Sequence, residues 1–142
     1  MQAPACRLLS LTVMPLIFKG LPDELNEQYV CGKCMYLAAA LHRRFGFPIE
    51  VCVEVPGTPQ AYVGHAWVVD PATGDVIDID GQYPASANGW LHPAGEHRQG
   101  LDEKELFALI TSTTYQPFED GEWEQSVADA QAVIDQYLFT QE

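Results

Sequence analysis

Alternating apolar and polar residues predict three β-strands in the middle of the chain. Residues 49–55 read IEVCVEV, which puts three valines on one face and two glutamates with a cysteine on the other. Residues 64–69 and 76–80 are two further strand-like runs, joined at 70–75 by DPATGD, a sequence typical of a tight turn. Because this connection is short, we expect these two strands to pair antiparallel.

Apolar residues at helical spacing predict a central helix over residues 34–45. Gly46 and Pro48 follow this segment, and glycine there is typical of a helix end. The predicted buried stripe comprises Leu37, Ala38, Leu41 and Phe45.

Weaker patterns complete the expected order of elements. Residues 7–18 suit a strand or a short buried segment, and 23–29 suit a capped helical turn. Further helices are expected over 101–110 and 122–139. Residues 81–100 combine Gly, Pro, Ser and Asn with aromatic side chains, which predicts a long irregular loop of the kind that often walls a site.

Length and charge narrow the class of protein. The 142 residues, 47% hydrophobic and 19% charged, fit one globular domain spanning 1–142, with no repeat or linker. A net charge of −13 argues against nucleic acid and anionic membranes as partners. No apolar run has the length of a membrane span, and four cysteines without a secretory leader suggest reduced thiols, so a cytoplasmic protein is expected. No feature predicts an oligomeric state.

Cys34 is the best candidate for a reactive group. It opens the predicted helix, where unpaired N–H groups and the positive end of the dipole favour a thiolate. A thiol nucleophile also needs an imidazole and a group that orients the ring. His65 supplies the imidazole, and either Asp78 or Asp80 on the next strand supplies the carboxylate.

Strand parity brings these groups to one face of the sheet. If Val69 pairs with Val76, then His65 shares a face with Asp78 and Asp80. The opposite face is then aliphatic, and consists of Ala66, Val68, Ile77 and Ile79.

The segment 28–81 resembles the papain-like and transglutaminase-like superfamily. Its sequence QYVCGKCM at 28–35 is similar to the papain-type motif in which a glutamine precedes the nucleophile by six residues. Transglutaminase cores share its order of helix, strand with His, then strand with Asp, and they have the closer Cys–His spacing. The other matching positions are Ala38, Arg44, Gly46–Pro48, His65–Val68 and Asp78.

The resemblance implies an α+β fold of the papain-like or transglutaminase-core type, a central helix on an antiparallel sheet covered by C-terminal helices. It implies that Cys34 attacks a peptide or glutamine amide through a thioester, with Gln28 contributing to the oxyanion hole. A protein or peptide substrate and no cofactor or metal are expected. Counting back from Gly46 also leaves Cys31, one helical turn earlier, as the alternative nucleophile.

Other interpretations of the same residues stay open. Cys31 and Cys34 match Cys-x-x-Cys, which suits a redox pair or, with Cys52 and His65, half of a zinc site. Two loop histidines, His92 and His97, are expected to be solvated. The alternative function is a non-enzymatic acidic protein, for example a phage or bacterial factor, that docks on a basic partner.

Overall fold

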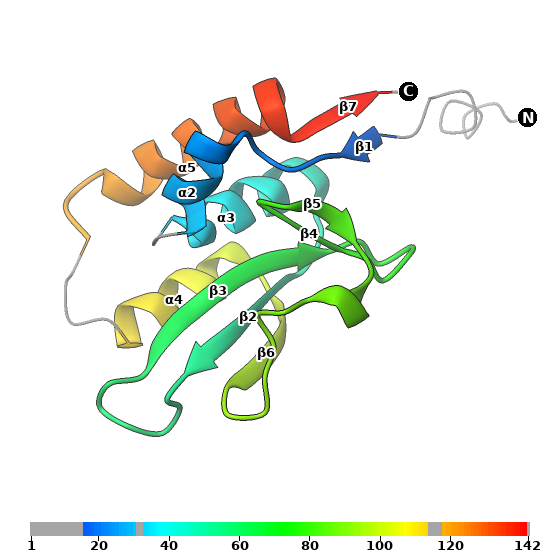
Figure 1. Cartoon of the computed structure of the whole chain (residues 1–142). Coiled ribbons are helices and arrows are strands. Elements are labelled where there is room, and N and C mark those ends of the chain that lie inside the picture. The colour runs from blue at the N-terminus through cyan, green and yellow to red at the C-terminus, as the bar shows by residue number, and fades with distance from the viewer. Residues whose placement is uncertain (1–15, 31–32, 114–117, 142) are drawn as a thin grey trace, which may run out of the picture.

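A computed structural model describes residues 16–30, 33–113 and 118–141 of the chain. This part contains a five-stranded antiparallel sheet with strand order β5-β4-β3-β2-β6 and four α-helices (Figure 1). The predicted α+β class is therefore confirmed. The sheet strands are β2 (Ile49–Glu54), β3 (Tyr62–Val69), β4 (Val76–Asp78), β5 (Gly81–Tyr83) and β6 (Glu96–Leu101). The helices are α2 (Asp23–Val30), α3 (Cys34–Phe45), α4 (Glu103–Thr113) and α5 (Glu122–Val133).

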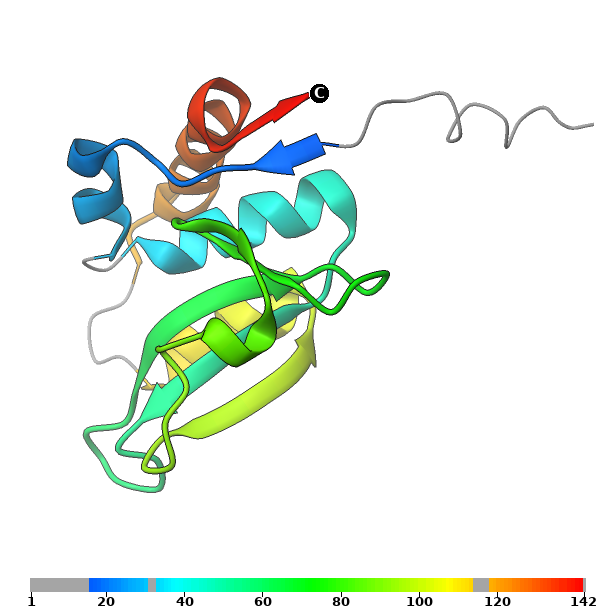
Figure 2. The same ribbon diagram turned by 45° about the vertical axis from the view of Figure 1, so that its right-hand side comes forward.

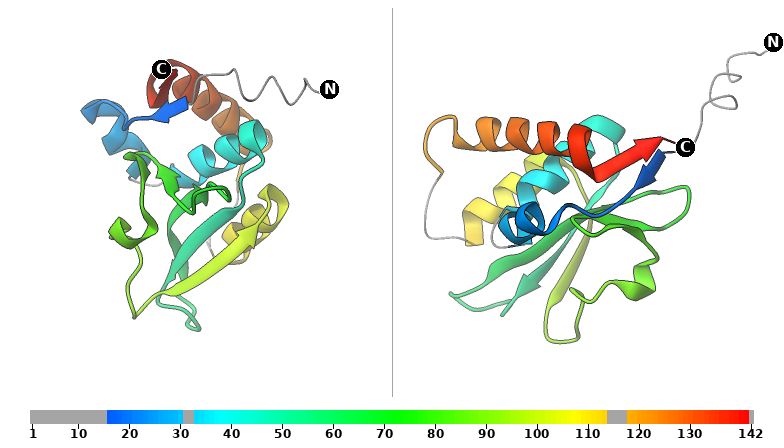
Figure 3. Two further views of the ribbon diagram at one scale, coloured as in Figure 1. Left: turned by 90° about the vertical axis from the view of Figure 1, so that its right-hand side faces the viewer. Right: turned by 45° about the horizontal axis from the view of Figure 1, so that its top comes forward.

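Helices and a loop cover opposite faces of the sheet. α3 and α4 pack against one face, and α5 lies on the far side of α3 from the sheet (Figure 3). The connection from β5 to β6, which contains the 3-10 turn η1 (Ala85–Ala87), crosses the other face (Figure 2). A separate two-stranded ribbon pairs β1 (Leu16–Phe18) with β7 (Phe139–Gln141).

The register of the β3–β4 hairpin agrees with the prediction. Val69 pairs with Val76 and Val68 with Ile77, and Ala66, Val68, Ile77 and Ile79 join the helix-side core. Trp67 and Val76 belong to a second apolar cluster on the loop side. This division follows from the period of two along a strand, because one face of each strand is buried under helices.

The central helix has the predicted bounds. It begins at Cys34, and Gly46 ends it in the left-handed conformation with φ of 75°, its N–H donating to the His42 carbonyl at 2.8 Å. Leu37 and Leu41 are fully buried, and each contributes roughly 1.5–3 kcal/mol through burial. The predicted stripe is therefore the packed face of the helix.

The expected irregular loop over 81–100 is wrong in part. It contains β5 and the edge strand β6, whose EHRQGL sequence has no alternating pattern and is exposed along most of its length. Charged residues are common on such edges because they discourage pairing with other chains. Strand β6 also occupies Leu101, so the next helix starts at Glu103.

The chain ends differ from the prediction in detail. The expected helix over 122–139 is α5 followed by a π-helical turn at Ile134–Leu138 and then β7. Of the segment 7–18, residues 7–15 lie outside the described residues, and the rest forms β1. In the described ranges, no helix is long and apolar enough to cross a membrane.

Candidate active site

Cys34 and His65 meet where α3 approaches the sheet. Cys34 is the first residue of α3, and its side chain is buried, with a relative exposure of 4%. The N-cap residue Lys33 makes no capping hydrogen bond with its side chain. The first-turn N–H groups therefore keep their positive field near the sulfur.

His65 is held by Asp78 from the neighbouring strand. Its Nε2 atom lies 3.2 Å from Asp78 Oδ2, and both residues are only 1% exposed. In the hairpin, Val68 of β3 lies opposite Ile77 of β4, and Asp78 is the residue after Ile77. Asp78 therefore reaches His65 diagonally across the two strands. The carboxylate therefore sets the orientation of the ring.

The Asp78 carboxylate is fully engaged. The Tyr83 hydroxyl donates to Oδ2 at 2.5 Å, and the backbone N–H of Asp80 donates to Oδ1 at 2.8 Å. Burial, together with the Asp78 carboxylate, raises the pKa of Tyr83, so this hydroxyl stays protonated and remains a donor. Three donors thus fix one buried carboxylate behind the imidazole.

The other ring nitrogen, Nδ1, is the one available to the thiol. It is buried and makes no hydrogen bond of good geometry to any described atom. Burial lowers the pKa of His65, but the hydrogen bond to Asp78 and the interaction with Cys34 outweigh it and raise the pKa to about 9. A ring that is charged at neutral pH stabilises negative charge on a neighbouring sulfur.

Aromatic side chains cover the imidazole. The Trp90 ring stacks on His65 with centroids 4.0 Å apart and an interplanar angle of 19°, and Trp67 lies 5.9 Å away. A cavity of about 490 Å³ adjoins this group and is lined by Asp80, Tyr83, Ala87, Gly89 and Trp90. Two of its walls therefore touch Asp78 and His65 directly.

The remaining predicted residues stand apart from this group. Asp80 is exposed and accepts a hydrogen bond from Asn26 of α2 at 3.0 Å, so it fastens a helix and does not contact the ring. Gln28 is exposed on α2, and among the described residues no hydrogen bond joins it to Cys34 or His65. Its role in an oxyanion hole stays a prediction, and Cys31 lies outside the described residues.

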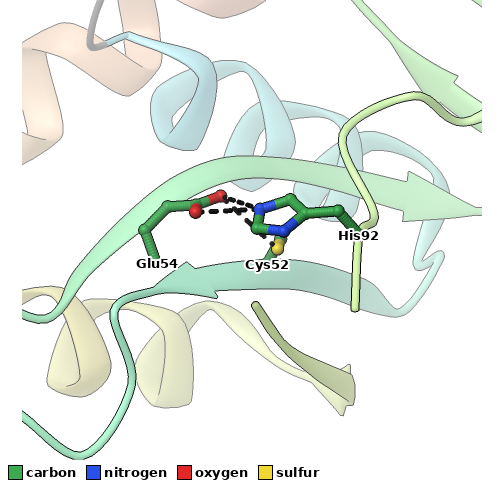
Figure 4. Close-up of side chains that lie close together, drawn as sticks. All are labelled: Cys52, Glu54 and His92. Carbon is green, nitrogen blue, oxygen red and sulfur yellow. Dashed lines mark hydrogen bonds and ion pairs between the residues drawn. The ribbon is translucent and has the colours of Figure 1, made fainter. Parts of the chain in front are cut away.

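His92 and His97 are both exposed, as predicted, and each also pairs with a carboxylate of β2. His92 Nε2 lies 2.9 Å from both carboxylate oxygens of Glu54, and His97 Nε2 lies 2.8 Å from Glu50 Oε1. Figure 4 shows His92 and Glu54 grouped with Cys52. The two glutamates of β2 therefore hold the chain segment that follows β5 against this face of the sheet.

Sequence reasoning missed two residues that surround the His65 imidazole and its partner Asp78. Tyr83 and Trp90 lie in the segment expected to wall a site, but nothing local shows that one bonds Asp78 and the other stacks on His65. The aromatic content of that segment was the available signal.

Comparisons of the chain with models of protein families, with curated proteins and with solved structures found no match.

Proposed function

We propose that this chain is a cysteine-dependent amide hydrolase or acyltransferase with a papain-like or transglutaminase-like core. The observation that supports it best is the His65 ring, buried between the Cys34 thiol and the Asp78 carboxylate with one nitrogen committed to the carboxylate. Orientation by a carboxylate leaves the other nitrogen to exchange a proton with sulfur, as a thiol nucleophile requires.

In the proposed reaction, the Cys34 sulfur attacks the carbonyl carbon of a peptide or glutamine amide. His65 holds the proton that the thiol has lost and delivers it to the leaving nitrogen as the C–N bond breaks. Water or an amine then attacks the thioester, His65 accepts a proton from that nucleophile, and the C–S bond breaks to restore the thiol. We expect the oxyanion to face the backbone N–H of Cys34, with Gln28 as the second donor.

The substrate is expected to bind beside the ring, in the cavity walled by Tyr83 and Trp90. This location is favoured because the same two side chains contact Asp78 and His65. Asp80 also lines the cavity, and its carboxylate favours a substrate that carries positive charge near the reacting amide.

The test measures acyl transfer by the full chain with glutamine-bearing peptides. Three readouts follow the proposed thioester. Ammonia release reports its formation from glutamine, incorporation of a fluorescent primary amine reports transfer, and hydroxylamine traps the thioester itself. We expect Cys34→Ser to abolish all three signals and His65→Ala to lower kcat/KM by about 10²–10⁴-fold. Cys31→Ser is the matched control and should keep its activity.

Thiol reactivity separates this proposal from a non-enzymatic acidic binding protein. Iodoacetamide followed by peptide mapping should modify Cys34 faster than Cys52, which is 1% exposed and whose thiol pKa is raised by burial and by Glu54. His65→Ala should remove the difference. Equal, slow modification of both cysteines together with unchanged amide turnover in Cys34→Ser would sink the proposed mechanism.

A further inference from the structure

A second group of reactive side chains lies on the loop side of the sheet, apart from Cys34. Cys52 and Glu54 occupy alternate positions of β2 and so face the same way, and His92 reaches them from the connection before β6 (Figure 4). One sulfur, one carboxylate oxygen and one imidazole nitrogen from these residues all lie within 4.8 Å of one another.

Two glycines leave room for this group. A methyl group on Gly95 would stand 2.5 Å from Cys52 Sγ and 3.3 Å from His92 Nε2, and one on Gly64 would stand 2.8 Å from Glu54 Oε2. Gly64 also lies where the β2–β3 register shifts, a place where strands commonly carry a bulge. Backbone on both sides therefore shapes the space around the three side chains.

Their distances are close to those of a metal site. A tetrahedral zinc ion with bonds of about 2.0–2.3 Å separates neighbouring ligand atoms by roughly 3.3–3.6 Å. Here Cys52 Sγ lies 3.6 Å from Glu54 Oε2, and His92 Nε2 lies 2.9 Å from the carboxylate oxygens. An ion would replace the proton between His92 and Glu54 after a small outward movement of both side chains.

We propose that Cys52, Glu54 and His92 bind a divalent transition-metal ion of the zinc class. Thiolate and imidazole ligands select zinc and cobalt over magnesium or calcium, and one carboxylate completes a three-ligand set with a fourth position open to water. The Cys52 thiol proton passes to solvent on binding, and the imidazole keeps a proton on Nδ1. The ion enters from the solvent side, since the His92 side chain is 40% exposed.

This site differs from the zinc site considered from the sequence, which combined Cys31 and Cys34 with Cys52 and His65. It shares only Cys52 with that set, and the chain was expected to hold no metal. It is also independent of the proposed amide chemistry, because none of its three ligands belongs to the Cys34–His65–Asp78 group. A metal-binding measurement therefore tests it without any assay of activity.

The experiment titrates Co²⁺ into the reduced full chain and follows the thiolate-to-cobalt charge-transfer absorption. We expect one ion per chain, displacement by Zn²⁺, and an upward shift of the thermal midpoint when Zn²⁺ is added. Cys52→Ser should lose the charge-transfer band. Glu54→Gln and His92→Ala should each weaken Co²⁺ binding by at least about tenfold. Replacing a residue that only orients a metal ligand already lowers metal affinity by that factor.

Glu50 and His97 provide matched controls on the same face of the sheet. They form a similar carboxylate–imidazole pair at 2.8 Å, so Glu50→Gln and His97→Ala should leave Co²⁺ affinity unchanged. Cys34→Ser should also keep the band. The proposal is overturned if the unaltered chain shows no band, if Cys34→Ser loses it while Cys52→Ser keeps it, or if Glu54→Gln and Glu50→Gln bind Co²⁺ equally well.

Discussion

At the scale of single residues, Asp78 and Asp80 show how two positions of a chain divide between different tasks. Both were candidates for the carboxylate behind His65, since residues two apart on a strand share a face. Strand β4 ends at Asp78, however, and the chain then turns, so Asp80 leaves the strand geometry and reaches Asn26 instead. The strand ends two residues before Asp80, so the parity argument does not hold for that residue.

Neutralising these two carboxylates one at a time should have unequal effects. Asp78→Asn keeps the size of the side chain but offers His65 an amide, and we expect kcat/KM for amide turnover to fall by about 10²–10⁴-fold. Asp80→Asn should change it by less than about tenfold, because this side chain lines the cavity but does not touch the ring. Equal losses in the two variants would contradict the assigned roles.

At the scale of elements, Arg43 joins three helices. It lies in the last turn of α3, and its guanidinium contacts both oxygens of Glu103 on α4, at 2.7 and 2.6 Å, and Glu124 on α5 at 2.9 Å. Trp123 of α5 donates to the same Glu103 carboxylate at 2.8 Å. Arg43 therefore holds α4 and α5 around the helix that carries Cys34.

Replacing Arg43 by lysine should weaken this junction although the charge is kept. An ammonium group does not reproduce the two parallel hydrogen bonds to Glu103. Because the side chain is 31% exposed, we expect Arg43→Lys to lower the free energy of unfolding by only about 1 kcal/mol. Urea denaturation measures this loss of stability. In a chain that already carries Glu103→Gln, Arg43→Lys should cause little further loss. An equal loss in that background would show that the Arg43–Glu103 contact is not its cause.

At the scale of the whole molecule, a buried ionisable pair makes folding depend on pH. His65 has a pKa of about 9 in the folded chain against an ordinary value of 6.5, so the folded state holds its proton more tightly than the unfolded state. The resulting stabilisation is fully present below about pH 6.5. It declines as pH rises and is lost once pH passes through about 9.

Denaturation at pH 6 and pH 10 should reveal this dependence. We expect the free energy of unfolding to fall between these values by on the order of 2–3 kcal/mol more in the unaltered chain than in His65→Gln. His65→Gln is the control, because tyrosines, lysines and cysteines titrate over this pH range in both proteins. An equal fall in the two proteins would show that His65 carries no raised pKa.

Local patterns in the sequence determined the main elements and the two faces of the sheet. Strands β2 and β3, helix α3 and the pairing of Val69 with Val76 follow from periods of 2 and 3.6 residues and from a short turn, all of which are properties of neighbouring residues. The candidate pair of Cys34 and His65 came from the same kind of reasoning, together with the resemblance.

Only the tertiary structure decided which distant residues meet. The choice of Asp78 over Asp80, the Trp90 ring on His65 and the approach of His92 to Glu54, 38 residues away, all depend on the path of the chain after β4. That path is set by packing of the whole connection against the sheet, and no periodic signal in the sequence records it.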